Sequence, residues 1–373
     1  MDSGSAGRST RWHTACAEAG VDTSRQPSLS QTAAIGIIAN PVSARDLRRI
    51  VTNASNLQIA ERANIVLRLL STARRLGVER VAMMPDRAGL RAMLTRHLGR
   101  ETRAHHDYPA LEFVDMPVTS TVEDTVVAAR AMREAGVRVL IVLGGDGTHR
   151  AVARACGDVP IVGLSTGTNN AFPEMREPTV AAMAAAMLAT GRVGADAALM
   201  DNKAIEVTIE GPAGTRRDIA IVDAVIAHER HVGARALWQP ESLAAAYLTF
   251  ADPQAIGFSA IGGLLQPIAR SESVGLAVQL EPAAPRQLLA PIAPGLLRPV
   301  GIADWHLMHA GEPLPVRQQA GVVALDGERE MPFEAGDTVH CTLRTAAFRT
   351  LDIPRCLHAA VQRGLFFASP DPH

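Results

Sequence analysis

A short glycine-rich segment, Gly144–Thr148, has the residue types needed to bind phosphate. It follows the apolar run Val139–Leu143 and precedes a segment with helical spacing. Glycines between a buried strand and a helix let backbone N–H groups approach phosphate oxygens, because no Cβ blocks the way and the helix N-terminus adds partial positive charge. We therefore predict a phosphate-binding loop that contains Gly144, Gly145, Gly147 and Thr148.

Asp146 lies in the middle of this loop. A carboxylate beside polyphosphate is electrostatically unfavourable unless it binds a cation or accepts a proton. Such a carboxylate can bind Mg²⁺ or accept a proton from a substrate hydroxyl, so we predict that Asp146 is a general base or a metal ligand. The structural alternative is a tight turn in which glycine supplies a positive φ angle and Asp146 caps the helix. The order strand, loop, helix favours the functional interpretation.

A second small polar loop follows the next apolar run, Ile161–Leu164. Neighbouring parallel strands bring their carboxyl ends to one edge of a sheet, where ligands bind. Hydroxyl and amide side chains suit contacts with ribose or phosphate, although such residues also stabilise plain turns. We predict ligand contacts from this loop, which consists of Ser165, Thr166, Gly167, Thr168, Asn169 and Asn170.

Two further positions are less specific. Asn40 follows the first apolar run and could form another wall of a nucleotide site, or simply a turn. Asp326 and Gly327 stand between two apolar runs, and this pair predicts first of all a hairpin turn.

Several function classes lack their signatures in this chain. There is no GxxxxGK[ST] loop, the cysteine and histidine spacings form no metal site, and Ser259 lacks the context of a nucleophile elbow. These absences weigh against a P-loop nucleoside triphosphatase and against a hydrolase. The formal net charge of −1 suggests no nucleic-acid partner and no anionic membrane surface. Four separated cysteines, a polar N-terminus and no long apolar stretch predict a cytoplasmic protein without a membrane-spanning helix.

The order of apolar runs predicts two domains. Strand and helix patterns alternate from residue 33 to about 195, which predicts an α/β domain with a doubly wound parallel sheet. Beyond residue 200 short strands dominate, among them a single strand at Asp218–Ile226 after a hairpin-like break at Gly211–Gly214. We predict a disordered tail at 1–31, an α/β domain at 32–199, a mostly β domain at 200–345, and a segment at 346–373 that returns to the first domain.

The GGDGT loop after a hydrophobic strand resembles the signature shared by NAD kinases, diacylglycerol kinases and sphingosine-type lipid kinases. Leu289–Val300 looks like a proline-rich segment of NAD kinases, and Leu325–Glu328 followed by Ala335–Val339 is similar to their DGQ strand pair and closer to the DGE of lipid kinases. Gly36–Arg49 and Ser165–Pro173 look most like the acetoin-catabolism X-type branch of this superfamily. The resemblance covers about residues 33–350.

This resemblance implies an α/β domain and a β-sandwich-like domain with the active site in the cleft between them. It also implies phosphoryl transfer from ATP to a hydroxyl with Mg²⁺, which in NAD kinases is the 2′-OH of the adenosine ribose of NAD. The family usually assembles as dimers or tetramers, so a homo-oligomer is expected. Carried over to this chain, the base is Asp146, the diphosphate-binding residues are Gly144, Gly145, Gly147 and Thr148, and the other nucleotide-binding positions are Asn169, Asn170, Asp223, Asp326 and Glu328.

Two departures from the family concern the acceptor. Val222 replaces the asparagine of the Asn-Glu motif, whose acidic half is matched by Asp223, and the TPTGSTAY-like stretch is not recognisable around Asp252–Gly263. Binding of ATP and Mg²⁺ is therefore better supported than NAD as the acceptor. Three functions remain open: a kinase for NAD or a similar small nucleotide, a lipid-type kinase, and a non-catalytic nucleotide sensor. The second lacks a basic or amphipathic membrane-facing segment.

Overall fold

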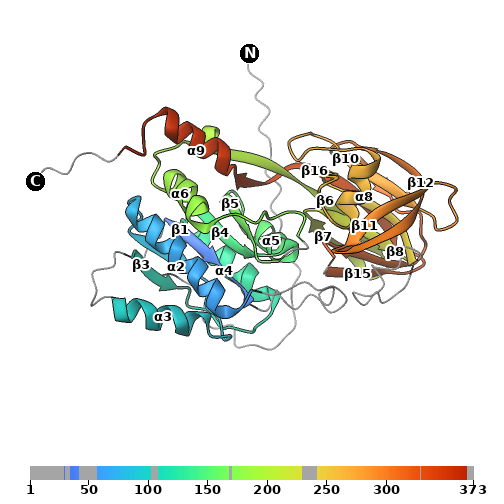
Figure 1. The fold of residues 1–373 in the computed structure, drawn as a ribbon. Coiled ribbons are helices and arrows are strands. Elements are labelled where there is room, and N and C mark those ends of the chain that lie inside the picture. Colours follow the sequence, from blue (N-terminus) through green and yellow to red (C-terminus); the bar gives the residue numbers. More distant parts are fainter. Residues whose placement is uncertain are drawn as a thin grey trace, which may run out of the picture.

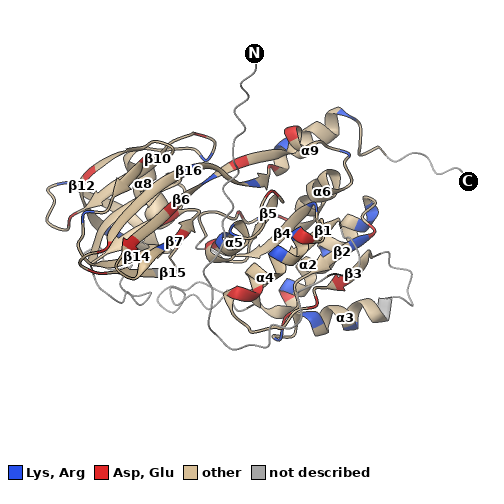
Figure 2. Ribbon diagram, turned by 180° about the vertical axis from the view of Figure 1, so that it is seen from behind, with Lys and Arg blue, Asp and Glu red and all other residues tan. Residues whose placement is uncertain are grey.

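A computed structural model describes residues 29, 34–41, 57–101, 108–167, 170–228, 242–327 and 329–367. The chain forms two lobes, with the N-terminal half of the sequence in one and most of the C-terminal half in the other (Figure 1). The tail predicted at 1–31 lies, apart from Leu29, outside the described residues. Acidic and basic positions are interspersed along the ribbon of both lobes, in keeping with the near-zero net charge (Figure 2).

The first lobe is built on five parallel strands in the order β3-β2-β1-β4-β5. The chain winds outward from β1 in one direction and from β4 in the other, which confirms the predicted doubly wound sheet. In such sheets the point where the winding reverses is where ligands bind, beside the carboxyl ends of the strands. The strands are β1 (Ile35–Ile38), β2 (Arg80–Met83), β3 (Ala110–Phe113), β4 (Val139–Gly144) and β5 (Ile161–Ser165).

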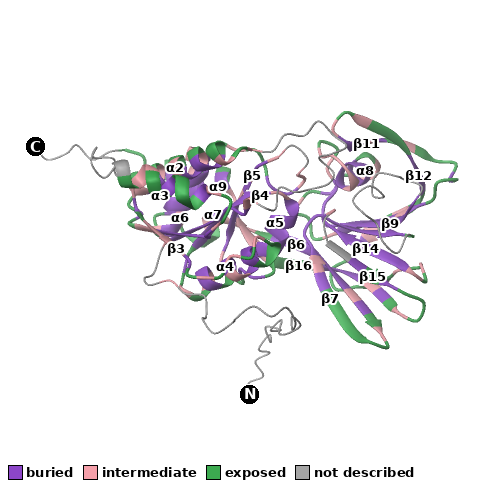
Figure 3. Cartoon of the chain, turned by 90° about the horizontal axis from the view of Figure 1, so that it is seen from below, coloured by how far each residue is buried: buried purple, intermediate pink, exposed green. Residues whose placement is uncertain are grey.

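Helices cover both faces of this sheet, and buried residues gather between them (Figure 3). β1 and β4 are buried along their whole length. Alternate residues point to opposite faces: Ile37 and Ile141 join one core with α2, α3, α6 and α9, whereas Ile38 and Val142 join the other with α4 and α5. The helices are α2 (Ile59–Arg75), α3 (Leu90–Glu101), α4 (Val122–Glu134), α5 (Asp146–Ala153), α6 (Pro178–Ala189), α7 (Ala195–Ala198) and α9 (Ile353–Gln362).

The second lobe contains a seven-stranded antiparallel sheet in the order β11-β12-β10-β9-β8-β14-β15. This confirms the predicted mostly β, sandwich-like second region. One face packs on α8 (Phe258–Leu265). The strands are β8 (Asp223–Ala227), β9 (Leu243–Leu248), β10 (Gly275–Leu280), β11 (Gln287–Ala293), β12 (Leu296–Met308), β14 (Gly321–Leu325) and β15 (Arg329–Phe333).

Two long strands connect the lobes. β16 (Thr338–Leu351) pairs with β5 in parallel and with β6 (Leu199–Gly211) in antiparallel, so the first sheet continues into the second lobe. There β6, β16 and β7 (Gly214–Ala220) face the second sheet across an apolar core. The short β13 (Pro313–Pro315) pairs with β16. The domain boundaries predicted near residues 200 and 345 thus fall on strands of one sheet, and they stay a prediction.

The strand predicted at Asp218–Ile226 is wrong as a single element. The chain leaves the first sheet after Ala220 and enters the second sheet at Asp223, with Ile221 and Val222 forming the crossing. Ile221 and Val222 are as apolar as the strand residues beside them because the crossing itself is buried, so the composition does not mark the break. The hairpin predicted at Gly211–Gly214 is confirmed, because these two glycines are opposite each other at the end of the β6–β7 pair.

Candidate active site

The glycine loop joins β4 to α5, on the side of the first lobe that faces the second (Figure 1). Gly145 is the N-cap of α5 with φ −97° and ψ −170°, and no glycine of the loop has a positive φ. Close packing requires glycine instead: a Cβ on Gly144 would lie 2.5 Å from Oγ1 of Thr148, and one on Gly145 would lie 2.6 Å from Oδ1 of Asn170. The turn alternative, with positive φ and Asp146 as the cap, is therefore wrong on both points.

Asp146 is the first residue of α5, and 5% of its surface is exposed. Its carboxylate accepts two consecutive backbone N–H groups, from Ala171 to Oδ2 (3.0 Å) and from Phe172 to Oδ1 (2.8 Å). Asp146 thus anchors the chain that follows the second polar loop, and it is held in one orientation by it.

The second polar loop lies beside the glycine loop, since β4 and β5 are neighbours with Gly144 opposite Ser165. Its side chains bond within the loop: Asn170 Nδ2 donates to Ser165 Oγ (2.7 Å), and Ser165 Oγ donates to the carbonyl of Gly167 (2.7 Å). Thr166 is buried. Two predicted members of the loop, Thr168 and Asn169, lie outside the described residues, as does Glu328.

Asn40 follows β1, the strand next to β4. The segment after β1 and the glycine loop after β4 therefore flank the point where the sheet reverses its winding. Its amide Nδ2 donates to the carbonyl of Thr121 (2.9 Å) and to Oγ1 of Thr125 (3.1 Å). The structure therefore places Asn40 at the predicted edge of the sheet, where it ties β1 to the start of α4.

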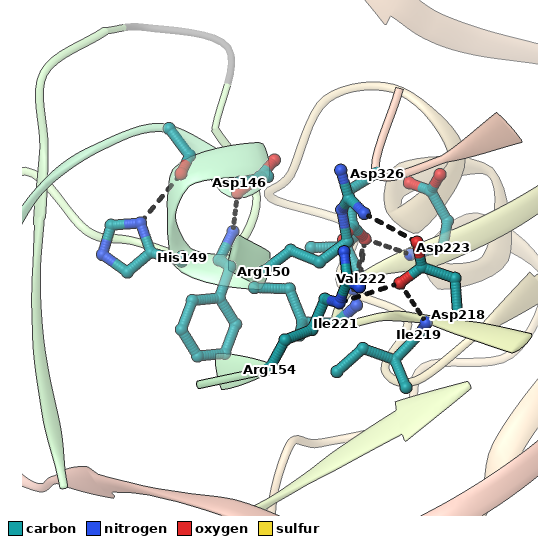
Figure 4. A network of polar contacts seen from close by, with 12 residues as sticks. Asp146, His149, Arg150, Arg154, Asp218, Ile219, Ile221, Val222, Asp223 and Asp326 are labelled. Atoms are coloured by element: carbon teal, nitrogen blue, oxygen red, sulfur yellow. Dashed lines mark hydrogen bonds and ion pairs between the residues drawn. The ribbon is translucent and has the colours of Figure 1, made fainter. Parts of the chain in front are cut away.

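A buried charge network connects α5 to the second lobe (Figure 4). Arg150, one helical turn after Asp146, lies with Nε 3.4 Å from Oδ2 of Asp326 and with Nη1 3.7 Å from Oδ2 of Asp218. Arg154 reaches the other oxygen of Asp218 at 3.3 Å. The side chains of Arg150, Asp218 and Asp326 are 6%, 4% and 0% exposed, so solvent screens these charges little.

Asp326 combines the predicted hairpin turn with a second role. Its φ of 49° and the φ of 69° at Gly327 form the turn, while its carboxylate accepts backbone N–H groups from the crossing between β7 and β8. Asp223 is bonded to Asp326 twice through its backbone. Its N–H donates to Oδ1 of Asp326 at 3.2 Å, and its carbonyl accepts the backbone N–H of Asp326 at 2.9 Å. Burial raises the pKa of Asp326 to about 7, against the opposing effects of Arg150 and the backbone donors.

Arg270 reaches the same region from the second lobe and was not predicted. Its Nη2 donates to the carbonyl of Ala171 at 2.6 Å, and its guanidinium lies between the rings of Phe172 and Phe250. Burial lowers its pKa, with Glu174 and Asp146 opposing that shift, and an arginine at this site stays charged. No local pattern marks Arg270, and the i, i+4 spacing between Asp146 and Arg150 would indicate a pair within α5 rather than the contacts that Arg150 makes with Asp218 and Asp326.

His149 is expected to make the stability of the folded protein sensitive to acid. Its ring is fully buried, Nδ1 lies 2.8 Å from the carbonyl of Gly145 and Nε2 has no hydrogen-bond partner. Burial lowers its pKa to about 4. The unfolded ring titrates near pH 6.5, so the unfolded state binds more protons between about pH 6.5 and 4. The free energy of unfolding should fall by up to roughly 3 kcal/mol as the pH drops through that window.

Urea denaturation of the wild type and His149→Gln at pH 7, 6 and 5 tests this expectation. The stability of the wild type relative to the variant should shrink as the pH falls, because only the wild type carries the titrating ring. A difference that stays constant across the three pH values would show that His149 is not held neutral by burial.

Comparisons with known proteins identify the family of the chain. The ATP-NAD kinase N-terminal domain matches residues 35–193, which contain the parallel sheet and both polar loops. Fold and loops together define an NAD kinase-like protein. The acetoin catabolism protein X C-terminal domain matches residues 203–346, and acetoin catabolism protein X of Cupriavidus necator is 55% identical over 343 residues, covering 91% of this chain and 95% of the relative. The chain belongs to the acetoin catabolism protein X family, an NAD kinase-like branch, as predicted.

Among solved structures, yeast NADH kinase complexed with NADH is similar at 10% identity and a TM-score of 0.48, covering 92% of this chain and 91% of that one. None of the helices in the described ranges is long and apolar enough to cross a membrane.

Proposed function

We propose that the protein is an ATP-dependent phosphotransferase that acts on a hydroxyl of NAD or a related small nucleotide. The observation that carries the proposal is the start of α5. Thr148 Oγ1 is buried without a hydrogen-bond partner there, beside backbone N–H groups that have no acceptor within the helix. A phosphate oxygen would satisfy these donors, and the helix N-terminus favours its negative charge.

The residues present also suit Mg²⁺. In the described part of the chain no cluster of three or more His, Cys, Asp or Glu side chains could hold a metal by itself. Mg²⁺ in kinase sites usually binds one or two carboxylates together with substrate phosphates and water, so Asp146 beside a triphosphate would be sufficient. When bound, the ion would neutralise charge on the transferred group.

Asp146 is the proposed general base. Its carboxylate would accept the proton of the acceptor hydroxyl while the hydroxyl oxygen attacks the γ-phosphorus and the bond to the leaving ADP breaks. The two N–H bonds from Ala171 and Phe172 fix the carboxylate before substrate arrives, which reduces reorganisation during the reaction.

The same two bonds also fit the second candidate, a nucleotide sensor in which Asp146 only holds the Ala171–Phe172 segment in place. A direct assay separates the candidates: purified protein is incubated with ATP, Mg²⁺ and NAD, NADP formation and ADP release are followed, and ATP affinity is measured by calorimetry. Because the acceptor motif has Val222 in place of asparagine, we expect ATP binding with NADP formation below about 1 per second.

Each result has a clear meaning. NAD turnover of about 1–100 per second would contradict the expected weakness of NAD as acceptor. ADP release with another nucleotide, but not with vesicles that contain diacylglycerol, would support a nucleotide kinase over a lipid kinase. ATP binding without any phosphoryl transfer would support the sensor.

A further inference from the structure

Arg270 is placed where the second lobe meets the first. It lies in the connection between α8 and β10, yet its hydrogen bond goes to Ala171, 99 residues earlier in the chain. The guanidinium carbon is 4.9 Å from the ring centre of Phe172 in the first lobe and 4.5 Å from that of Phe250 in the second. Arginine cations are attracted to aromatic faces within about 6 Å, so both rings hold the side chain in this crossing position.

The partner of Arg270 is the same residue that binds the candidate base. Ala171 receives the guanidinium at its carbonyl and donates its N–H to Asp146, and Phe172 both stacks on Arg270 and donates to Asp146. A displacement of this dipeptide would therefore move two of the donors that orient the carboxylate. Arg270 and Asp146 hold the dipeptide from opposite sides.

The loop that carries Arg270 is fixed by Lys203, the only lysine of the chain. Lys203 Nζ, from β6, donates to the carbonyls of Ala269 (3.1 Å) and Val274 (2.7 Å), which bracket Arg270. Glu272 Oε1 accepts the N–H of Ala269 at 2.6 Å and closes the loop on itself. Such charge-assisted bonds give Arg270 a defined starting point for its reach across the junction.

We infer that Arg270 is a positioning residue of the site. Lys203 holds the loop that carries Arg270, and Arg270 in turn fixes the Ala171–Phe172 dipeptide from the second lobe. The dipeptide then sets the orientation of the Asp146 carboxylate. The kinetic part of this inference rests on the proposed phosphotransferase function. The part that concerns the dipeptide does not.

Hydrogen exchange tests the dipeptide without any need for turnover. In Arg270→Ala, a peptide that contains Ala171 and Phe172 should exchange roughly 10- to 100-fold faster, the range expected for loss of a hydrogen bond to a charged group. Arg270→Lys keeps the charge but not the planar stacking, so its exchange rate at the dipeptide should lie between those of Arg270→Ala and the wild type. Arg286→Ala is the matched control, because Arg286 stacks on Trp305 in the second lobe at 5.3 Å. It should leave exchange at the dipeptide unchanged.

Lys203→Met tests the support of the loop. If Lys203 acts through Arg270, Lys203→Met alone should speed exchange at the dipeptide by less than Arg270→Ala, and the double variant should match Arg270→Ala alone. Additive effects in the double variant would overturn the role of Lys203. Unchanged exchange in a folded Arg270→Ala or Arg270→Lys protein would overturn the positioning role altogether.

The kinetic readout completes the test. With whichever acceptor the wild type uses, Arg270→Ala should lower kcat by roughly tenfold or more while the Kd for ATP stays within about twofold. A raised Kd with unchanged kcat would instead make Arg270 an ATP-binding residue and overturn the inference. If the wild type transfers no phosphoryl group, the proposed function fails, and the exchange data still decide whether Arg270 holds the dipeptide.

Discussion

Asp146→Asn is expected to lower phosphoryl transfer by about 10²–10⁴, the usual contribution of a general base, while the affinity for ATP without Mg²⁺ is kept. Asparagine has nearly the same size but cannot accept the hydroxyl proton. The proposed phosphate-binding groups are unchanged, because they are backbone N–H groups at the start of α5 and the hydroxyl of Thr148. The measurements are initial rates with the identified acceptor and calorimetric titration with ATP.

A stability cost accompanies this substitution. The two oxygens of Asp146 each accept a backbone N–H, and asparagine offers one oxygen and one amide group. One donor loses its partner, at a cost of about 1–3 kcal/mol. The matched control is Asp86→Asn, because Asp86 likewise accepts two consecutive N–H groups, from Leu90 and Arg91. The control should lower the melting temperature and leave turnover per folded molecule within about twofold.

The comparison separates a chemical from a structural role for Asp146. If both variants lose stability but only Asp146→Asn loses turnover, Asp146 takes part in the chemistry. If Asp146→Asn keeps wild-type turnover, the carboxylate only anchors the second loop and the sensor becomes the better description of the protein.

The glycine loop could be predicted because its evidence is local. An apolar strand, a run of glycines and a helix follow one another within about fifteen residues, and β4 and α5 form as that order indicates. The reason for the glycines could not be predicted in the same way. Gly145 is constrained by the side chain of Asn170, 25 positions later, and that contact exists only once β4 and β5 are paired.

The groups that complete the site across the junction have no local signal. Arg270 meets Ala171 over a separation of 99 residues, and Asp326 meets Val222 over 104. The Asp-Gly pair at Asp326 correctly predicted a turn, but a turn pattern does not reveal what its carboxylate will bind. The long strands β6 and β16 also join both lobes, which the composition change near residue 200 does not indicate.

Arg150→Met is expected to destabilise the protein by about 3–5 kcal/mol at pH 8, since it leaves the buried carboxylate of Asp326 without its cation. Methionine fills a similar volume, so the loss comes from charge rather than from a cavity. The ionised carboxylate of Asp326 is destabilised most, because its side chain is fully buried and Arg150 is its nearby cation. Asp218 keeps the guanidinium of Arg154 at 3.3 Å.

The pH dependence identifies Asp326 as the cause. Its pKa is about 7 in the folded wild type and near 4 when unfolded, so the folded state binds the extra proton between these values. The free energy of unfolding therefore falls as the pH rises from about 4 to 7, by about 1.4 kcal/mol per unit at most. Without Arg150 the folded pKa rises further, and the fall continues to higher pH.

The destabilisation by Arg150→Met should thus be clearly smaller at pH 5, where Asp326 is protonated with or without the arginine, than at pH 8. Urea denaturation of wild type and variant at both pH values measures it. Arg154→Met is the control on the same helix: its side chain is 41% exposed, so we expect less than about 1 kcal/mol and little change with pH. An equal loss at pH 5 and pH 8 in Arg150→Met would show that Arg150 stabilises the junction by packing, and that Asp326 is not the group it compensates.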